Sequence, residues 1–540
     1  MKKIFFFSVV ILFFVACKHL NSHSDKTIFK LNLSATATHL DPAFSSDQPN
    51  TWSCNLLYNG LVQLDNHLQV QPCIAKRWEI SEDRKTYTFH LRKDVFFHDN
   101  VCFKNAEGRK VVANDFVFSF NRLLDPATAA RGNWVFENIV TAVNPFVTIN
   151  DSTLQIHLLK PFAPFLQRLA IPYCSVIPHE AITFYGKDFR SNPVGTGPFK
   201  FLKWNEGEVL ILHKNETYFE FDSAGNRLPY LDAVNISFIS NKSTEFLKFL
   251  NHELDFVSDI DVSLKDNILT KDGKLQPRYT NEFKLLKGPY LNTEYFSILM
   301  DTSAAILKNS PLQNKKIRQA INYAFDRNEM LLFLRNNRGI AATAGFVPPS
   351  LYIESNNLNF GYYYLPERSL QLLKEAGFEN GIGLSEITLH TTDQYQDFAV
   401  YIKDKLEDIG IKTKIEIVDP RMLRQMRVNM ETNFFRSSWI ADYPDAETYL
   451  NLFYSKSGAP PNYTRYNNLQ YDMLFEKAIT ETDIILRNEL YIQLDSIITN
   501  DAPIIPLFYD EVYRFVQNNI YGLEPDALNM LQLKNVQKKN

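Results

Sequence analysis

Apolar and polar positions follow regular spacings in several parts of the chain, and each spacing predicts an element. Residues 86–91 (TYTFHL) alternate, with every second side chain apolar, which predicts a strand with one buried face. Residues 317–325 carry apolar side chains at i, i+3, i+4, i+7 and i+8, the spacing of an amphipathic helix. Residues 398–409 predict another helix, ended by Gly410, and alternation over 411–417 predicts a strand directly after it.

A further helix is expected to open at Asn114 and Asp115, one of which would cap it, and to bury Phe116, Phe120 and Leu123. A helix that leads straight into a strand indicates α/β units with covered sheets. At 540 residues the chain should form more than one domain. It shows neither an internal repeat nor a linker of distinctive composition, so the pattern does not place domain boundaries.

The N-terminus has the layout of an export signal. Two lysines precede an apolar run, Ile4 to Ala16, that is too short for a bilayer span of about 20 residues and fits a secretory signal peptide over 1–16. Phe14 to Cys17 (FVAC) resembles a bacterial lipobox, which implies that Cys17 carries the lipid anchor. Residues 17–26 are polar and predict a tether, and no second long apolar run follows.

Composition excludes several classes of function. With 57 Lys and Arg against 61 Asp and Glu, the chain lacks the positive charge of nucleic-acid binders. The common nucleotide-binding, metalloprotease and hydrolase motifs are absent and the 11 histidines are scattered, so we expect no enzyme, metal or cofactor. Four cysteines follow Cys17, and both disulfides and free buried thiols are compatible with their spacing; they are Cys54, Cys73, Cys102 and Cys174.

Residues 192–199 (NPVGTGPF) combine two prolines with two glycines and contain no side chain suited to acid, base or nucleophilic chemistry. Such a cluster most often marks a surface turn, and the alternative is that it shapes a binding site. Together with the run to Tyr218, the segment resembles the signature of the extracytoplasmic solute-binding proteins of peptide ABC importers, solute-binding family 5. Further motifs resemble that family in its own order; they lie at 40–42, 58–61, 74–99, 113–119, 317–327, 376–378, 406–411, 439–445 and 501–507.

The resemblance implies an α/β, periplasmic-binding-protein-like fold of type II, in which two lobes close on a ligand like a Venus flytrap, with an extra small domain inserted in the first lobe. The implied division is lobe 1 over 27–58, 186–288 and 512–540, the inserted domain over 59–185, and lobe 2 over 289–511. The family also implies a binding protein rather than an enzyme. Closure of the lobes would bury the ligand by hinge motion.

The function implied is a monomeric lipoprotein, anchored on the periplasmic side of a bacterial membrane, that captures peptides and delivers them to an ABC permease driven by ATPase subunits. Its partners would be a peptide ligand, those subunits and the membrane through the anchor, but no nucleic acid. The alternative within the same fold is a nickel chelate, an opine, haem or an oligosaccharide. An extracytoplasmic hydrolase or a surface adhesion module is a weaker alternative.

The resemblance also proposes ligand-binding residues. Asp442 matches the position that pairs with a ligand α-ammonium, and Arg436 and Arg427 match arginines that receive ligand carboxylates. Trp439 would line the cleft, as would Trp52 and Tyr58. Asp510 stands where relatives tend to carry a tyrosine, and facing the cleft it would favour a cationic ligand.

These residues also have ordinary structural interpretations. Asp445 is expected to cap a helix over 446–453, and Asp442 could do the same. Without the resemblance, Arg427 and Arg436 would be read as solvated or surface-paired arginines, and Trp439 as a core residue.

Overall fold

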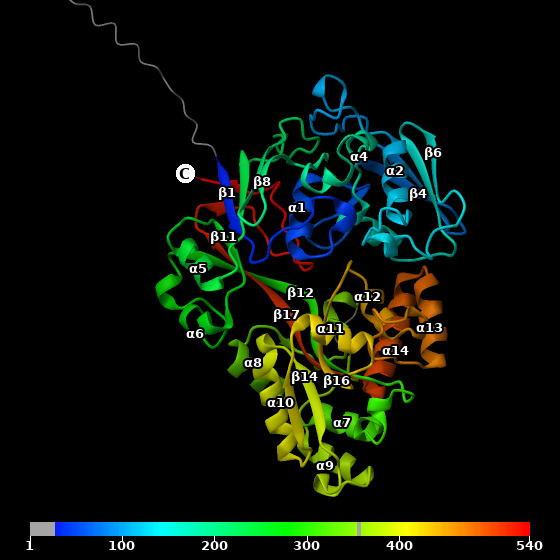
Figure 1. The fold of residues 1–540 in the computed structure, drawn as a ribbon, viewed down its shortest axis with the longest axis vertical. Coiled ribbons are helices and arrows are strands. Elements are labelled where there is room, and N and C mark those ends of the chain that lie inside the picture. The colour runs from blue at the N-terminus through cyan, green and yellow to red at the C-terminus, as the bar shows by residue number, and fades with distance from the viewer. Residues whose placement is uncertain (1–26, 354–357, 540) are drawn as a thin grey trace, which may run out of the picture.

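The computed structural model describes residues 27–353 and 358–539, and its ribbon forms two masses joined by long strands (Figure 1). Most strands belong to one mixed sheet in the order β15-β14-β16-β12-β17-β11-β1-β10-β9-β8, with β13 also paired to β17. Their bounds are β1 Ile28–Asn32, β8 Phe199–Asn205, β9 Val209–Lys214, β10 Ala233–Ser237, β11 Phe256–Ser258, β12 Phe283–Ile298, β13 Ile340–Ala341, β14 Ile387–Thr391, β15 Thr413–Ile417, β16 Phe434–Ile440 and β17 Ile504–Gln517.

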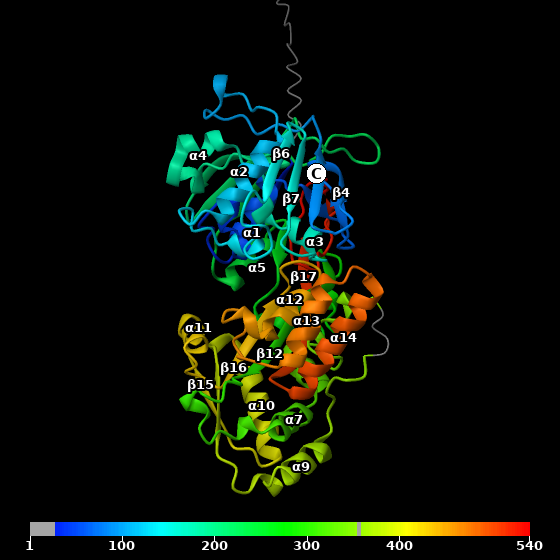
Figure 2. The same cartoon turned by 90° about the vertical axis from the view of Figure 1, so that its right-hand side faces the viewer.

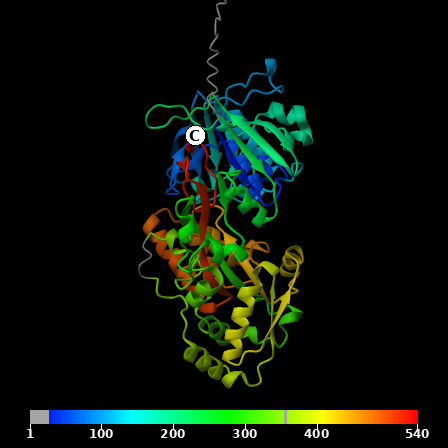
Figure 3. The ribbon, with the colours of Figure 1, turned by 90° about the vertical axis from the view of Figure 1, so that its left-hand side faces the viewer.

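Strands β12 and β17 connect the two masses, as Figures 2 and 3 show from either side. They pair antiparallel from Phe283 with Gln517 to Ser297 with Ile504, and their register is interrupted between Pro289 and Thr293. The expected lobe boundaries at 288/289 and 511/512 fall at this interruption, where a break in the ladder would let the strands bend. We propose that these strands form the hinge between the lobes.

A second, smaller sheet lies apart from the first, in the order β4-β5-β7-β6, and lies within the expected inserted domain. Its strands are β4 Ala75–Ile80, β5 Thr86–Leu91, β6 Phe146–Asn150 and β7 Thr153–His157. Helix α2 (Ala113–Leu124) packs Phe120 against Phe146 of β6 at a ring separation of 5.3 Å. Two strand pairs complete the sheets: β2 Val62–Leu64 with β3 Val70–Pro72, and β18 Ile520–Tyr521 with β19 Gln537–Lys538.

Helices cover both masses, and Figure 1 shows α1, α2 and α4 above the junction and α7 to α14 below it. The remaining α-helices are α1 Gln48–Leu57, α3 Phe165–Leu169, α4 His179–Tyr185, α5 Lys242–Leu250, α6 Lys265–Ile268, α7 Lys315–Tyr323, α8 Arg327–Arg335, α9 Pro366–Glu375, α10 Gln396–Asp408, α11 Pro420–Val428, α12 Glu447–Leu450, α13 Leu469–Thr480 and α14 Ile484–Asp501. The backbone N–H of Ala163 donates to the carbonyl of Ile479 at 3.0 Å, so the 59–185 stretch also contacts α13 directly.

Most elements expected from periodicity are confirmed. Strand β5 spans Thr86–Leu91 with alternate side chains buried, and α10 is followed by Gly410 at φ +87°. Helix α7 ends at Tyr323, so Ala324 and Phe325 lie beyond it, although both are buried. Strand β15 begins at Thr413 rather than 411, as the edge strand of the large sheet.

The expected cap of α2 is wrong. The N-cap is Val112, and Asp115 lies in the first turn, where its carboxylate accepts the Val112 N–H at 2.9 Å. The carboxylate therefore satisfies a free N–H from inside the helix rather than from the position before it.

The expected signal peptide, Cys17 and the tether over 17–26 lie outside the described residues. Within the described ranges, none of the helices has the length and apolar character needed to cross a membrane.

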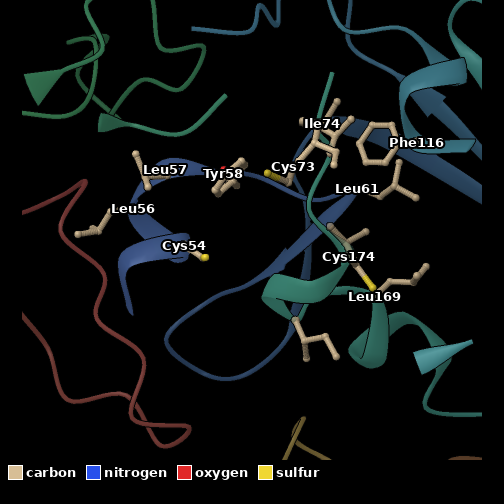
Figure 4. Close-up of a cluster of buried hydrophobic side chains, with 14 of the residues drawn as sticks. Cys54, Leu56, Leu57, Tyr58, Leu61, Cys73, Ile74, Phe116, Leu169 and Cys174 are labelled. Carbon is tan, nitrogen blue, oxygen red and sulfur yellow. The ribbon is translucent and has the colours of Figure 1, made fainter. Parts of the chain in front are cut away.

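The four cysteines of the described chain are free thiols rather than disulfides. Cys54, Cys73 and Cys174 lie in the apolar cluster around Tyr58, as Figure 4 shows. Burial raises the pKa of the Cys73 thiol to about 12, which keeps it protonated and unreactive.

Candidate functional site

The Pro-Gly segment 192–199 is a buried support for helix α1, so the interpretation as a surface turn is wrong. Residues 193–199 are all buried. A Cβ on Gly195 would lie 2.0 Å from the Leu57 carbonyl oxygen, and one on Gly197 would lie 2.4 Å from the Leu57 carbonyl carbon. Neither glycine adopts positive φ, so both are required for close approach. The Gly197 N–H donates to the Leu57 carbonyl at 2.9 Å, which fixes the end of α1 next to Tyr58.

Helix α1 forms part of the wall of a cavity of about 340 Å³ that both masses line. Its contributors include the 45–64 stretch, residues 170–175, Tyr290, the 440–442 segment that follows β16, and residues 526–534 near the C-terminus. Aromatic side chains are prominent in the lining: Trp52, Tyr58, Trp134, Tyr173, Tyr218 and Tyr290. A cavity of this size with aromatic walls and a few polar groups is typical of a small-molecule site.

Asp442 is exposed in this cavity, where the 440–442 segment lies opposite residues 170–175. The preceding residue is held in place, because the Ala441 N–H donates to the Leu291 carbonyl at 2.8 Å. Within the described residues, the Asp442 carboxylate accepts no hydrogen bond and joins no ion pair. Protein atoms around it desolvate the charged form and raise the pKa of Asp442 to about 6, against the opposing effect of Arg168.

Because the N-cap of α12 is Ala446, Asp445 does not hold the capping position expected of it, although it binds the start of the helix. Its Oδ1 accepts the Glu447 N–H at 2.9 Å, at the start of α12. Asp445 also lies 4.0 Å from the Arg487 guanidinium and is itself buried. The two aspartates of this segment therefore differ: Asp445 is committed to local structure, whereas Asp442 is not.

Arg436 is already paired within the protein and does not line the cavity. Its Nη2 donates to both carboxylate oxygens of Glu294, at 2.9 and 2.6 Å, and its guanidinium lies 3.6 Å from the ring centroid of Tyr395. Burial raises the pKa of Glu294, with Arg436 opposing the shift. Arg436 is thus half-buried in an ion pair rather than solvated.

Arg427, at the end of α11, has no carboxylate partner within the described chain. Its Nη1 lies 3.4 Å from the Ser437 hydroxyl, and its guanidinium lies 4.6 Å from the Tyr463 ring. Burial lowers the pKa of Arg427. Like Arg436, it does not line the cavity that contains Asp442.

The other named residues occupy supporting places. Tyr58 is buried and its hydroxyl donates to the Leu40 carbonyl at 2.9 Å, while Trp52 donates to the Asn529 carbonyl at 2.7 Å. Trp439 packs at the edge of the core that contains Tyr449, outside the cavity lining. Asp510 is half-buried beside Asn292, whose amide lies 3.4 Å from its Oδ2, and it does not line the cavity.

Residues that periodicity and motifs did not single out also form the site. Tyr173 and Tyr290 line the cavity, and Asp526 adds a carboxylate from near the C-terminus. Arg168, from α3, is buried close to Asp442. These residues come from distant parts of the chain and show no local pattern. Among the described residues, no cluster of three or more His, Cys, Asp or Glu could hold a metal ion.

Comparison with known proteins finds relatives that are all described as binding proteins for small solutes. The family described as bacterial extracellular solute-binding proteins, family 5 Middle, matches residues 69–461. The chain is 27% identical over 502 residues to a glutathione-binding protein of Salmonella choleraesuis, covering 91% of each chain. It is 26% identical to the dipeptide-binding protein of Escherichia coli, covering 89% of this chain and 88% of that one.

A solved structure extends the likeness to the fold. The periplasmic binding protein DppA of Helicobacter pylori, in complex with the peptide STSA, matches with a TM-score of 0.78 at 25% identity, over 95% of this chain and 98% of that one. The mixed α/β architecture with a small extra antiparallel sheet is therefore that of periplasmic peptide-binding proteins.

Proposed function

Because the chain belongs to the bacterial extracellular solute-binding proteins of family 5, the non-catalytic binding proteins of ABC importers, we propose that its solute is a peptide with a free amino terminus. The peptide would bind in the cavity that Asp442 lines and pass from there to the permease. Lipid attachment at Cys17 would hold the protein at the membrane, as the FVAC motif implies.

The unpaired carboxylate of Asp442 carries this proposal. A charged group surrounded by protein atoms is costly unless an opposite charge or hydrogen-bond donors compensate it. A ligand ammonium would supply both, through short charge-assisted hydrogen bonds. Asp442 therefore gives the cavity a preference for a primary amine, and the names of two relatives, which specify a dipeptide and glutathione, agree with such a ligand.

Recognition of the ligand carboxylate is proposed to depend on Arg427 rather than Arg436. Arg436 already binds Glu294, whereas Arg427 has a guanidinium without a carboxylate partner in the described chain. Movement of the lobes would be needed to bring Arg427 to a ligand in the cavity. Arg427→Met should then lower the affinity only for ligands that carry a free carboxylate.

Thermal unfolding of the soluble body, from about residue 27 onward, tests the proposal. Alanine peptides of two to six residues would be compared with their N-acetylated forms. A ligand at 100-fold its Kd stabilises the folded state by about 2.7 kcal/mol. We expect stabilisation by free peptides only, lost in Asp442→Asn and kept in Asp445→Asn, the matched control three residues away.

Stabilisation by acetylated and free peptides alike would refute the role of Asp442. Stabilisation by an oligosaccharide, a haem or a nickel chelate, and by no peptide, would keep the family and refute the peptide assignment.

A further inference from the structure

Arg168 is a buried arginine at the boundary between the 59–185 stretch and the expected lobe 2, and it has no carboxylate partner among the described residues. Arg168 is only 7% exposed, and its buried Nε has no hydrogen-bond acceptor in the described part of the chain. The guanidinium lies 5.0 Å from the Trp134 ring, 4.7 Å from Phe162 and 5.3 Å from Tyr443. Within the described residues it joins no ion pair. Removing a charge from water without a partner is costly, so this placement requires a compensating interaction.

One of these three rings, that of Tyr443, comes from across the boundary, in the segment that contains the candidate ligand-binding carboxylate. Tyr443, whose ring contacts Arg168, directly follows Asp442. Glu447 follows on α12, buried and bound by the Tyr443 hydroxyl. No carboxylate of this segment comes within 4 Å of the Arg168 guanidinium, because the three rings hold the guanidinium through cation–π contacts.

The ion pair between Arg436 and Glu294 shows how a direct contact with an arginine would affect a ligand-binding carboxylate. There the guanidinium donates to both oxygens of Glu294, so that carboxylate has few acceptor positions left for a ligand. At Asp442 no guanidinium of the described chain contacts the carboxylate, so both of its oxygens stay available.

We propose that Arg168 is a positioning residue for ligand binding: its positive charge holds Asp442 in the ionised form without occupying the oxygens that receive a ligand ammonium. This inference rests on the proposed function of Asp442 and adds the residue that maintains it. It also gives the inserted stretch a role in binding, because α3 supplies the charge and lobe 2 supplies the carboxylate.

The charged and titratable groups around Asp442 determine how affinity depends on pH. Arg168 favours the ionised form, whereas Glu447 is a second acid, and Tyr173 and Tyr449 are phenols that stay neutral because burial raises the pKa of each. Desolvation by the surrounding protein atoms raises the pKa of Asp442 to about 6, so about half of the molecules are ionised at pH 6. Loss of a nearby opposite charge typically raises a carboxyl pKa by about one unit or more.

Arg168→Met, which keeps the packing and removes the charge, should therefore weaken binding of a free-amine peptide roughly fivefold at pH 6 and hardly at all at pH 8. The probe is trialanine, and its Kd would be measured by calorimetry between pH 5.5 and 8.5. Arg168→Lys keeps the positive charge and should restore most of the affinity for trialanine that Arg168→Met loses at acidic pH. The control is Arg487→Met, which removes an arginine beside Asp445 on the same interface and should leave the profile unchanged.

An equal loss of affinity at every pH in Arg168→Met would mean that Arg168 contributes through packing alone. An affinity profile identical to that of the wild type would exclude any role of Arg168 in binding. Carboxyl NMR titration of Asp442 in the ligand-free protein separates this inference from the proposed function. If trialanine does not bind the wild type, the peptide proposal fails. The titration then still decides whether Arg168→Met raises the Asp442 pKa, and an unchanged pKa overturns the inference.

Discussion

Replacing Glu294 by alanine would leave Arg436 as an uncompensated charge on the paired strands β12 and β16. The Glu294 side chain is 5% exposed and that of Arg436 is 19% exposed, so water replaces the lost partner poorly. At the observed separation of 2.6 Å, the attraction between unit charges is about 6 kcal/mol for an effective dielectric constant of 20. Desolvation of both ions offsets most of this attraction in the intact pair.

Breaking a buried pair on one side is nevertheless expensive, by about 3–5 kcal/mol, because the remaining charge stays buried. We expect Glu294→Ala to lower the free energy of unfolding by about 3 kcal/mol, near the lower end of that range, because Arg436 keeps its contact with the Tyr395 ring at 3.6 Å. Arg436→Met combined with Glu294→Ala should recover much of the loss, because neither charge then remains buried.

Urea unfolding of the wild type, both single variants and the double variant measures the coupling between the two residues. We expect the summed losses of stability in the two single variants to exceed the loss in the double variant by more than about 1 kcal/mol. Additive losses, or a loss below about 1 kcal/mol for Glu294→Ala, would show that the pair is solvated and that Arg436 is free to bind a ligand.

Two further predictions concern the support of the site and its acids. Gly197→Ala places a methyl group 2.4 Å from a backbone atom of α1 and should destabilise the protein by about 1–3 kcal/mol. Gly60→Ala is the control, because its methyl group would have its nearest contact at 3.4 Å, and it should destabilise the protein far less. Equal urea midpoints of unfolding for the two variants would contradict this expectation. Burial raises the pKa of Glu447 to about 7, above its value in the unfolded chain. The folded state therefore holds a proton that the unfolded state has lost, and the free energy of unfolding should fall as pH rises from 5 to 8. Glu447→Gln should flatten that decline, and a decline of unchanged slope in this variant would exclude Glu447 as its source.

Local patterns predicted elements well where one face of an element meets the core. Strand β5 matched its expected bounds, because alternation over Thr86–Leu91 reflects a single buried face. The cap of α2 was wrong because Asn114 and Asp115 are both suitable capping residues, and the sequence does not show that the carboxylate binds the Val112 N–H from inside the first turn.

Contacts between distant segments could not be predicted in the same way. Residues 192–199 have the composition of a turn, and only the tertiary contact of Gly195 and Gly197 with Leu57 shows that they are buried. Arg436 finds its partner 142 residues earlier in the chain, on the neighbouring strand. Arg168 lies outside every motif that indicated the family, although it is close to Asp442, a candidate residue that lines the cavity.

The most direct test of the peptide-binding account is a crystal structure of the protein with trialanine or a longer alanine peptide. We expect the peptide to lie in the cavity lined by Tyr58, Tyr173 and Asp442, with its terminal nitrogen within about 3.2 Å of an Asp442 oxygen. A peptide bound elsewhere, or one whose ammonium contacts Asp526 or Asp510 while Asp442 faces solvent, would contradict it.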